Sequence, residues 1–443
     1  MENRYDKYKD SGIAWIGEIP EHWEVIKIKQ LLKNNSLKVG PFGSQLSGSD
    51  ILSDGKYWIY NQRTVLDNNF SSCNSFITHE KYNDLIGFKV NAGDILLTTR
   101  GTIGKISRVP TTFNEGVIHP CIIRFNINES ILKYDILKYI FNDSDLVINQ
   151  VKYNSNSTTI DVIYSDTLKN IILTCIPKEE QQSIATYLDQ KCSEIDELIT
   201  LQEEMITKLQ SYKQSVITEA VTKGLDKNVP LKDSGIEWIG EIPEHWKISK
   251  IKSHYNVILG KMVEKNNDSS TSGENYLCAA NIKWNGVDTE INKKMYFSDI
   301  EKEKYLLQYN DVLIMEGGMA GTTCLYKNQF SPCYVQNSVN VCRAKKDFNN
   351  KFLYYWMYVP YYNGYIDTIC NKATIKHYTK EKVQNTPILV PLISEQQSIA
   401  DYLDQKCSEI DALISIKQQK IEKLKDYKKS LIFECVTGKR KVS

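Results

Sequence analysis

Two segments of this chain occur twice. Residues 9–29 read KDSGIAWIGEIPEHWEVIKIK and residues 232–252 read KDSGIEWIGEIPEHWKISKIK, with four differences between them. Residues 180–199 read EQQSIATYLDQKCSEIDELI and residues 395–414 read EQQSIADYLDQKCSEIDALI, with two differences. Between these copies the two halves have diverged almost completely. The chain therefore presents one scaffold twice and attaches two different surfaces to it.

Composition excludes several classes of protein. The chain has 443 residues, of which 41% are hydrophobic, and a net charge of +1. No stretch has the apolar length that a membrane span needs, and the start MENRYDKYKD lacks the apolar centre of a secretory signal. Eleven cysteines without a CxxC pair favour neither a disulfide framework nor a zinc site, so no metal is expected. These features predict a reduced, cytoplasmic protein.

Two long helices are expected where the second copied segment begins. Apolar residues recur every seven positions from Leu188 and from Leu403, as in a coiled-coil seam. Residues 178–223 carry a net charge of −4 and residues 394–441 a net charge of +2, which favours pairing of the two helices. Because the halves are repeats, an antiparallel pair with a pseudo-two-fold axis is the simplest arrangement. The expected helix-pairing residues are Leu188, Ile195, Leu198, Leu209, Leu403, Ile410, Leu413 and Leu424.

In this assignment Leu198 and Leu413 belong to a companion row, three residues beyond Ile195 and Ile410. The row continues through Met205, Tyr212, Lys420 and Tyr427. Gln202 and Lys417 fall at equivalent positions of the main row, where polar groups tend to fix the register of a coiled coil.

The regions between the copied segments predict mixed α/β domains. GDILLTTRGTIGKISRV (93–109) reads as strand, glycine turn and strand, and NDVLIMEGGMAGTTCLY (310–326) repeats the plan. The tryptophans around GEIPEHW are expected to clamp this lead-in against each domain. The expected divisions are a first domain at 1–177, a first spacer helix at 178–223, a second domain at 224–392 and a second spacer helix at 393–443.

No catalytic motif is found. GTIGK resembles a phosphate-binding loop, but Thr99 stands where a glycine is required and Ile106 where serine or threonine would bind magnesium, so a hairpin turn is favoured. His22 and His245 are repeat partners within GEIPEHW and are interpreted as structural imidazoles that bond to the backbone. The sequence predicts a protein without a catalytic centre.

Two different surfaces on one scaffold suit a protein that reads two half-sites along double-stranded DNA. With a net charge of only +1, the affinity for DNA must come from local clusters of basic residues. Amides and hydroxyls can read base edges, and lysine and arginine can hold phosphates. The candidate DNA contacts in the first half are Lys38, Ser44, Gln45, Arg63, Arg100, Lys105, Asn154, Asn156 and Thr158. Those in the second half are Lys261, Lys283, Trp284, Lys372, Lys376 and His377.

Together the doubled GEIPEHW, the GPFGSQL turn, DILLTTRGTIGK and the helix openings PKEEQQSIATYLD and PLISEQQSIADYLD resemble the specificity (S) subunit of type I restriction-modification enzymes. The resemblance covers essentially the whole chain. It implies an α+β fold with two similar mixed α/β target recognition domains, separated by two long antiparallel coiled-coil helices in a pseudo-two-fold internal repeat. It also implies a non-catalytic subunit that reads a bipartite DNA site.

The same resemblance implies partners. Two modification (methyltransferase) subunits would bring S-adenosylmethionine and methylate adenine, and restriction (translocase and nuclease) subunits would bring ATP and Mg. No cofactor is expected in this chain. Two other classes of function remain open, a stand-alone DNA-cleaving enzyme and a repeat adaptor that binds only proteins. The near-identity of the copied segments beside divergent intervening regions favours DNA recognition over both.

Overall fold

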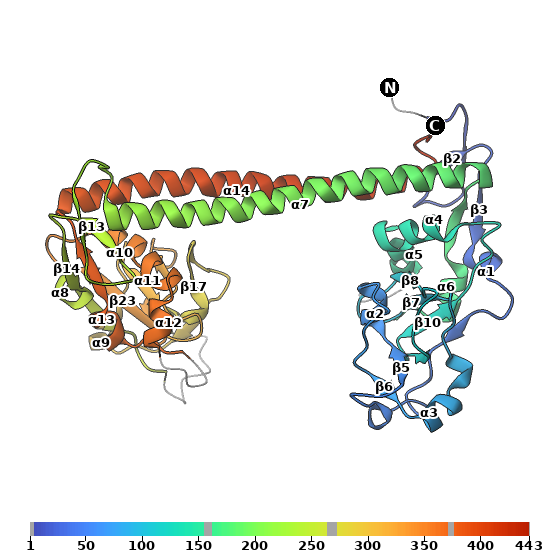
Figure 1. Cartoon of the computed structure of the whole chain (residues 1–443), viewed down its shortest axis with the longest axis horizontal. Helices are drawn as coiled ribbons and strands as arrows, with labels where there is room; N and C mark the ends of the chain where they lie inside the picture. Colours follow the sequence, from blue (N-terminus) through green and yellow to red (C-terminus); the bar gives the residue numbers. More distant parts are fainter. Residues whose placement is uncertain (1–3, 155–161, 264–272, 371–375, 443) are drawn as a thin grey trace. The chain divides into compact units, whose positions relative to one another are not determined.

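The computed structural model describes residues 4–154, 162–263, 273–370 and 376–442. It comprises two compact units: unit 1 holds residues 1–202 and 419–443, and unit 2 holds residues 203–418. The long helices α7 (Lys178–Lys223) and α14 (Ile393–Val436) are each continuous, so each contributes one half to each unit (Figure 1). In the described ranges, no helix has the length and apolar character needed to cross a membrane.

Each unit is built around an antiparallel four-stranded sheet with the same strand order. In unit 1 the order is β4 (Lys38–Val39), β10 (Ile122–Phe125), β7 (Ile95–Thr98) and β8 (Ile106–Arg108). In unit 2 it is β15 (Tyr255–Leu259), β23 (Val339–Ala344), β20 (Val312–Met315) and β21 (Thr323–Leu325). The two predicted hairpins are thus β7–β8 and β20–β21, which confirms them.

Smaller sheets complete each unit, and they also correspond. The lead-ins form β1 (Tyr8–Asp10) with β2 (Glu18–Pro20), and β12 (Leu231–Asp233) with β13 (Glu241–Pro243). Each lead-in then pairs with the strand before a long helix, as β3 (Glu24–Lys27) with β11 (Ile172–Cys175) and β14 (Lys247–Lys250) with β24 (Pro387–Val390). The remaining strands are β5 (Tyr57–Tyr60), β6 (Phe76–Ile77), β9 (Gly116–Ile118), β16 (Glu274–Leu277), β17 (Ile282–Lys283), β18 (Gly286–Val287), β19 (Lys293–Met295) and β22 (Tyr334–Val335).

Short helices cover the sheets. Those of unit 1 are α1 (Ile28–Leu31), α2 (Gln62–Leu66), α3 (His79–Asp84), α4 (Tyr134–Lys138), α5 (Leu146–Asn154) and α6 (Ser165–Asn170), with a π-turn at Tyr139–Asp143 after α4. Those of unit 2 are α8 (Ile251–His254), α9 (Asp299–Tyr305), α10 (Asn350–Trp356), α11 (Tyr358–Tyr362), α12 (Tyr365–Ile369) and α13 (Lys380–Asn385).

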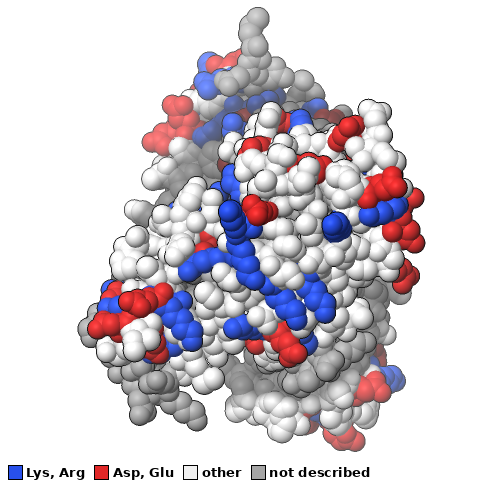
Figure 2. All heavy atoms as spheres, turned by 90° about the vertical axis from the view of Figure 1, so that its left-hand side faces the viewer, with Lys and Arg blue, Asp and Glu red and all other residues white. Residues whose placement is uncertain are grey.

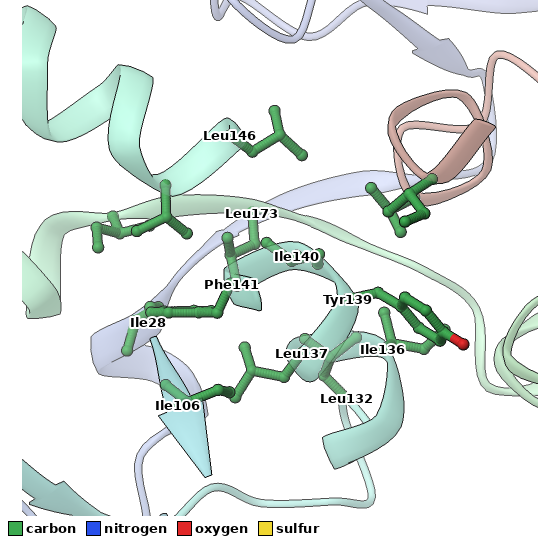
Figure 3. Close-up of a cluster of buried hydrophobic side chains, with 14 of the residues drawn as sticks. Ile28, Ile106, Leu132, Ile136, Leu137, Tyr139, Ile140, Phe141, Leu146 and Leu173 are labelled. Atoms are coloured by element: carbon green, nitrogen blue, oxygen red, sulfur yellow. The ribbon is translucent and has the colours of Figure 1, made fainter. Parts of the chain in front are cut away.

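Both long helices take part in the hydrophobic core of each unit. In unit 1, Leu188 of α7 and Leu431 of α14 are buried in one cluster with sheet residues such as Leu97. Figure 3 shows the part of this cluster that surrounds α4 and the π-turn, with side chains Ile28, Ile106, Leu132, Ile136, Leu137, Tyr139, Ile140, Phe141, Leu146 and Leu173. In unit 2, Val221 of α7 and Leu403 of α14 are buried in the corresponding cluster. The long helices and the sheet thus contribute to one core in each unit.

The two copied segments bind each other. In unit 1 the Glu180 carboxylate in the first turn of α7 contacts His22 Nε2 at 2.6 Å and accepts a hydrogen bond from Trp23 Nε1 at 3.2 Å. It also accepts a hydrogen bond from the Tyr5 hydroxyl. In unit 2, Glu395 of α14 repeats this arrangement with the matching histidine at 3.0 Å and tryptophan at 3.3 Å.

The tryptophans of these contacts, Trp23 and Trp246, are fully buried, which confirms that they clamp the lead-in. The histidines are structural, as expected, but the expectation of backbone partners is wrong, because a carboxylate from a distant helix receives the ring. Burial alone would raise the pKa of Glu180, but the hydrogen bonds from Tyr5, His22 and Trp23 outweigh it and lower that pKa. The stabilising contribution of Glu180 is therefore present above the ordinary pKa of glutamate and lost as pH falls through the lowered pKa.

The helices pair in an antiparallel way within each unit, by equivalent contacts. In unit 1, Lys428 Nζ lies 2.7 Å from a carboxylate oxygen of Asp196. In unit 2, Lys213 Nζ lies 2.7 Å from a carboxylate oxygen of Asp411. Asp196 and Asp411 are repeat partners, as are Lys213 and Lys428, so the contacts follow the internal pseudo-two-fold symmetry.

The main row of the predicted seam is buried at Leu188, Ile195, Leu403 and Ile410, with Leu209 and Leu424 half-buried. Gln202 is buried in this row as well. The predicted companion row is wrong as a buried row, because Leu198, Met205, Tyr212, Leu413 and Tyr427 are 42–56% exposed, although Met205 Sδ lies 3.1 Å from Lys417 Nζ of the other helix. The true companion row lies four residues beyond each main position, at Cys192, Ile199, Ile206, Lys213, Cys407, Ile414, Ile421 and Lys428. Two members of this row are lysines that reach across the seam, so apolar spacing alone does not mark it.

Replacement of Glu180 by alanine is expected to lower the free energy of unfolding by about 1–3 kcal/mol, because the buried Trp23 Nε1 loses its acceptor. Glu179→Ala is the matched control, since that carboxylate is one residue earlier and exposed. Denaturant unfolding of both variants at neutral pH measures the difference. Equal stability of the two variants would contradict the role of Glu180 as the joint between lead-in and helix.

Candidate nucleic-acid interface

The turns that follow β7 and β20 occupy equivalent positions in their units. Thr98 pairs with Ile122 in unit 1, and Met315 pairs with Val339 in unit 2. From these pairs the two turns align without a gap as TTRGTIGK and MEGGMAGT. Both use glycines with positive φ, namely Gly101, Gly104, Gly318 and Gly321. We call this end of each four-stranded sheet its turn end.

Three segments that are distant in the sequence meet at the turn end of unit 1. Arg100, in the turn itself, is exposed. Gln62, the first residue of α2, donates from Nε2 to the backbone oxygen of Thr102 at 3.2 Å. His119, between β9 and β10, has a pKa lowered by burial and, to a lesser extent, by the positive charge of Arg100.

The lowered pKa keeps the His119 ring neutral at physiological pH, and its tautomer follows from a hydrogen bond. Its Nδ1 accepts from the backbone nitrogen of Cys121 at 3.1 Å. A neutral ring with Nδ1 as acceptor carries its proton on Nε2. The ring therefore has one donor, which could serve a base-edge acceptor such as guanine O6, adenine N7 or thymine O4.

The GPFGSQL segment reaches the same place. A Cβ atom on Gly40 would lie 2.2 Å from the backbone oxygen of His119, so only glycine allows this close approach. Beyond Gly40 the chain turns and exposes Ser44 and Gln45. The side-chain oxygen of Gln45 accepts a hydrogen bond from the backbone nitrogen of Phe42 at 3.0 Å, which holds the turn.

Four sequence-predicted contacts of the first half lie in segments that reach the turn end of unit 1: Ser44, Gln45, Arg63 and Arg100. Arg63 follows Gln62 in α2 and is highly exposed, with Nε 3.2 Å from a carboxylate oxygen of Asp67. Lys38 and Lys105 are engaged elsewhere. Lys38 lies over the ring of Phe88, with its Nζ 4.6 Å from the ring centre. The ammonium of Lys105, a predicted DNA contact, donates to the backbone oxygen of Asn142, and burial lowers its pKa, so this side chain is engaged within unit 1.

Asn156, Thr158 and Lys372 lie outside the described residues, as does the side chain of Asn154. The residues that adjoin these segments are at the turn ends. Val162 forms a β-bridge with Arg100 in unit 1, and His377 forms one with Gly317 in unit 2.

At the turn end of unit 2, His377 and Lys376 are exposed beside Gly317. The Lys376 ammonium lies 2.7 Å from a carboxylate oxygen of Asp367. Glu316 precedes Gly317, and burial raises the pKa of its carboxyl, although the charge of His377 opposes this. Both sequence-predicted residues, Lys376 and His377, therefore lie where the second hairpin turns.

Lys261 and Trp284, two of the predicted DNA contacts, are engaged with other residues of unit 2. Lys261 is only 6% exposed, and its Nζ lies 2.7 Å from a carboxylate oxygen of Glu301 and 3.0 Å from the backbone oxygen of Tyr296. Trp284 packs among tyrosines, with its ring centre 4.1 Å from that of Tyr358. The sequence did not reveal these contacts because the partners of both side chains, Glu301 and Tyr358, come from distant segments. Lys283, the last residue of β17, precedes Trp284 and is half-buried.

Sequence reasoning missed four polar residues at the turn ends: Gln62 and His119 in unit 1, Glu316 and Gln336 in unit 2. Gln336 is the counterpart of His119, since each stands three residues before the paired residues Val339 and Ile122. No motif marks these positions. The one available signal is a polar residue directly after a buried apolar run, as in GVIHP and CYVQN.

A second surface of unit 2 is basic. β14 and α8 lie at the left-hand edge of this unit in Figure 1, and Figure 2, which faces that edge, shows a band of lysine and arginine side chains. The exposed lysines of β14, α8 and the residues after β23 are Lys247, Lys250, Lys252, Lys345 and Lys346. We call these five residues the basic band. β23 runs from the turn end at Val339 to Ala344, so Lys345 and Lys346 lie at the opposite end of the sheet.

The counterpart of the basic band in unit 1 is neutral. The alignment of the lead-ins and of β10 with β23 places Glu24, Lys27, Lys29, Asn128 and Glu129 at these positions. Five lysines in unit 2 give +5, whereas two lysines and two glutamates in unit 1 give 2 − 2 = 0. The net charge of +1 therefore conceals the local clustering of basic residues that DNA binding was expected to require.

Comparisons with known proteins agree with this architecture. A family model described as the type I restriction modification DNA specificity domain matches residues 20–210 and 243–426. A protein of Methanocaldococcus jannaschii assigned as the type I restriction enzyme MjaX specificity subunit is 26% identical over 450 residues, covering 96% of each chain.

Two solved structures share the fold. A chain from a structure concerned with complex assembly and conformational transition of the type I R-M system superimposes with a TM-score of 0.71 at 16% identity, covering 94% of this chain and 98% of that chain. The HsdS subunit from Thermoanaerobacter tengcongensis superimposes with a TM-score of 0.53 at 15% identity, covering 95% of this chain and 98% of that chain. Since the family model matches both halves and most of the sequence, the chain belongs to the type I restriction-modification DNA specificity family.

Proposed function

We propose that each unit reads one half of a bipartite DNA sequence with its turn end. The observation that carries this proposal is a contrast within the chain. The scaffold contacts of Glu180 recur at Glu395, whereas at the turn ends Arg100 is replaced by Gly317 and His119 by Gln336. A scaffold that is repeated in both units, with turn ends that carry different polar residues, suits a subunit that directs one complex to two different half-sites.

The two turn ends differ in the chemistry that they offer to base edges. In unit 1, exposed Arg100 can donate two hydrogen bonds to guanine, and His119 can donate one from Nε2. In unit 2, a carboxylate at Glu316 can accept from the amino group of cytosine, and the amide of Gln336 can pair with adenine. The two half-sites are therefore expected to differ in sequence.

The basic band suits contacts with phosphates. Lysine is a compact, strongly hydrated point charge, so it holds phosphates without the fixed fork geometry of arginine. The exposed positions of the band are lysines with no large apolar side chain among them. The contribution of the band to affinity is expected to be independent of sequence and sensitive to salt.

In this proposal the chain is the DNA-recognition subunit and takes no part in bond making or breaking. Two modification subunits would supply S-adenosylmethionine and the adenine-methylating site, and restriction subunits would supply ATP- and Mg-dependent translocation and cleavage. This assignment rests on family membership and on the sequence, which contains no cofactor loop. The assembly is placed in the cytoplasm, a reducing compartment in which the eleven free cysteines would stay reduced.

The two alternative classes of function make different demands. A stand-alone nuclease would cleave DNA without any other subunit. A protein-binding adaptor would bind the modification subunit but leave DNA binding unchanged when the turn ends are altered. Exposed Arg100 and the Nε2 donor of the neutral His119 ring at the same turn end favour DNA reading over the adaptor.

The purified chain is expected to methylate and cleave nothing by itself. With the modification subunit and S-adenosylmethionine, adenine methylation should appear at one bipartite sequence. Tritiated methyl transfer to genomic DNA, followed by mapping of the methylated adenines, measures both. Methyl transfer or cleavage by a preparation shown to lack modification subunit would contradict a recognition-only role.

Arg100→Ala is expected to relax one position of the half-site read by unit 1, at a cost of about 1–3 kcal/mol in discrimination. The other half-site should keep its sequence, because it is read by unit 2, which has Gly317 at the equivalent position and is unchanged in this variant. Lys33→Ala is the control, since this exposed lysine lies near Asn126, at the opposite end of the sheet. Methylation-site mapping compares the variants. Relaxation of both half-sites would show that the two units do not read independently.

Lys247→Glu combined with Lys346→Glu should weaken binding to all DNA sequences and reduce the slope of log affinity against log salt by about 2. Both changes introduce residues that unit 1 already carries at Glu24 and Glu129, so the fold should tolerate them. The control is Lys304→Glu with Lys327→Glu, which makes the same charge change at exposed sites outside the band. Equal salt slopes for the two double variants would exclude the band as a phosphate contact.

A further inference from the structure

Each turn end exposes a large apolar side chain at the same position. Phe42 in unit 1 is 77% exposed, and Met262 in unit 2 is 71% exposed. Burying such a side chain typically stabilises a protein by about 1.5–3 kcal/mol. Two units whose surfaces have otherwise diverged therefore share an apolar side chain that most of this stabilisation does not reach.

Phe42 and Met262 are structural counterparts. Each stands two residues after a glycine, Gly40 or Gly260, whose backbone nitrogen donates to the first residue of the neighbouring strand in the sheet, β10 or β23. These acceptors are the oxygens of Ile122, at 2.9 Å, and Val339, at 3.3 Å, which are the paired residues that define the turn ends. A Cβ atom on either glycine would fall within 2.2–2.4 Å of the backbone at residues 119 and 336. The close approach fixes where the next residues leave the sheet.

Phe42 is exposed on a turn that is held by hydrogen bonds. Its backbone oxygen accepts hydrogen bonds from the nitrogens of Gln45 at 2.8 Å and Leu46 at 3.2 Å. Its own nitrogen donates to Gln45 Oε1 at 3.0 Å, and Leu46 is buried on the other side of the turn. The aromatic ring is therefore presented outward from a fixed base, and its position does not depend on the rest of the loop folding over it.

Polar groups lie near each apolar side chain along the chain. Phe42 lies between Gly40, which touches His119, and the exposed pair Ser44 and Gln45. Met262 follows Lys261, whose backbone oxygen accepts from the nitrogen of Asn337 at 2.9 Å. Unit 2 also exposes Val263 and Met319, but unit 1 has glycine and threonine at those positions, so among the described residues of the turns and of the GPFGSQL segment Phe42 and Met262 are the matched apolar pair. In unit 1, an exposed ring beside polar groups does not resemble the apolar core of a protein interface.

We propose that Phe42 and Met262 are wedges that enter the DNA stack, one in each half-site. Phenylalanine and methionine are among the side chains that proteins insert between base steps to unstack and kink a duplex. Flanking donors and acceptors would then hold the opened step in register. This inference rests on the proposed function, because the wedges sit on the surfaces that read DNA.

The test uses the full chain assembled with the modification subunit and duplexes that carry the methylated site. 2-Aminopurine, whose fluorescence rises when it is unstacked, replaces single adenines other than the methylated one. The wild-type complex should show one enhanced position in each half-site. Phe42→Ala should abolish the signal in the half-site read by unit 1 and weaken binding roughly 5- to 150-fold. Met262→Ala should do the same in the other half-site only.

Phe42→Met is the matched variant, because the chain itself uses methionine at the equivalent position of unit 2. It should keep both the fluorescence signal and most of the affinity. Since Phe42 and Met262 are highly exposed, their truncation leaves no cavity and the variants should fold as the parent does.

Several outcomes would overturn the wedges. Unchanged 2-aminopurine fluorescence with Phe42→Ala would do so. Failure of Phe42→Ala to assemble with the modification subunit in the absence of DNA would also do so, because the ring would then make a protein contact. A third such outcome is that replacing thymine by uracil in the DNA lowers the affinity of the wild type by as much as Phe42→Ala does. That result would show that the Phe42 ring contacts a thymine methyl group. Each of these leaves sequence-specific binding by the wild type intact. Absence of any specific binding by the wild-type complex would instead overturn the proposed function together with the wedges.

Discussion

A carboxylate in the first turn of each long helix joins the repeated parts of this chain. Glu180 and Glu395 each receive a histidine and a buried tryptophan from the GEIPEHW lead-in, which lies more than 140 residues earlier in the sequence. The tryptophan nitrogen has no water to bond once it is buried, so the acceptor must come from the protein. This requirement ties the lead-in, the helix and the domain between them into one unit. It explains why both copied segments differ so little between the halves.

A second set of contacts extends the same joint along each helix. Gln181 and Gln396 are buried directly after the two glutamates, and each accepts a hydrogen bond from a backbone nitrogen of its own domain, at 2.8 Å from Lys133 and 3.0 Å from Asn349. Further on, Asp189 accepts from the hydroxyl of Tyr139 at 2.6 Å, and Asp404 does so from Tyr355 at 2.7 Å. With the support fixed by these polar contacts, the turn ends are free to differ. That separation lets one fold present two different sets of donors and acceptors.

The fold is repeated in the two units, but the distribution of surface charge is not. The two units share their strand order and their helix contacts, yet the basic band is confined to unit 2, and its counterpart in unit 1 is neutral. The change needs only glutamate and asparagine at three exposed positions in place of lysine, which costs the fold little. Electrostatic attraction to DNA can therefore be adjusted in one half without disturbing the side chains that would read bases.

The sequence by itself determined the internal repeat, the two hairpins and the main row of the helix seam, because each depends on local spacing or on copied residues. It also led to the correct family, since the repeated motifs are specific to it. It did not determine the companion row of the seam. Rows three and four residues ahead are both compatible with the heptad, and the true row contains Lys213 and Lys428, whose partners Asp411 and Asp196 come from the other helix.

Only the tertiary structure decided which polar residues meet. His119 joins Arg100 because β9 and the hairpin converge at one end of the sheet, and Phe42 arrives there because Gly40 passes against the backbone of His119. Lys261 looks like a surface cation in the sequence but is buried against Glu301, forty residues away. Such partners are set by strand pairing and burial across long separations, and a local pattern carries no record of them.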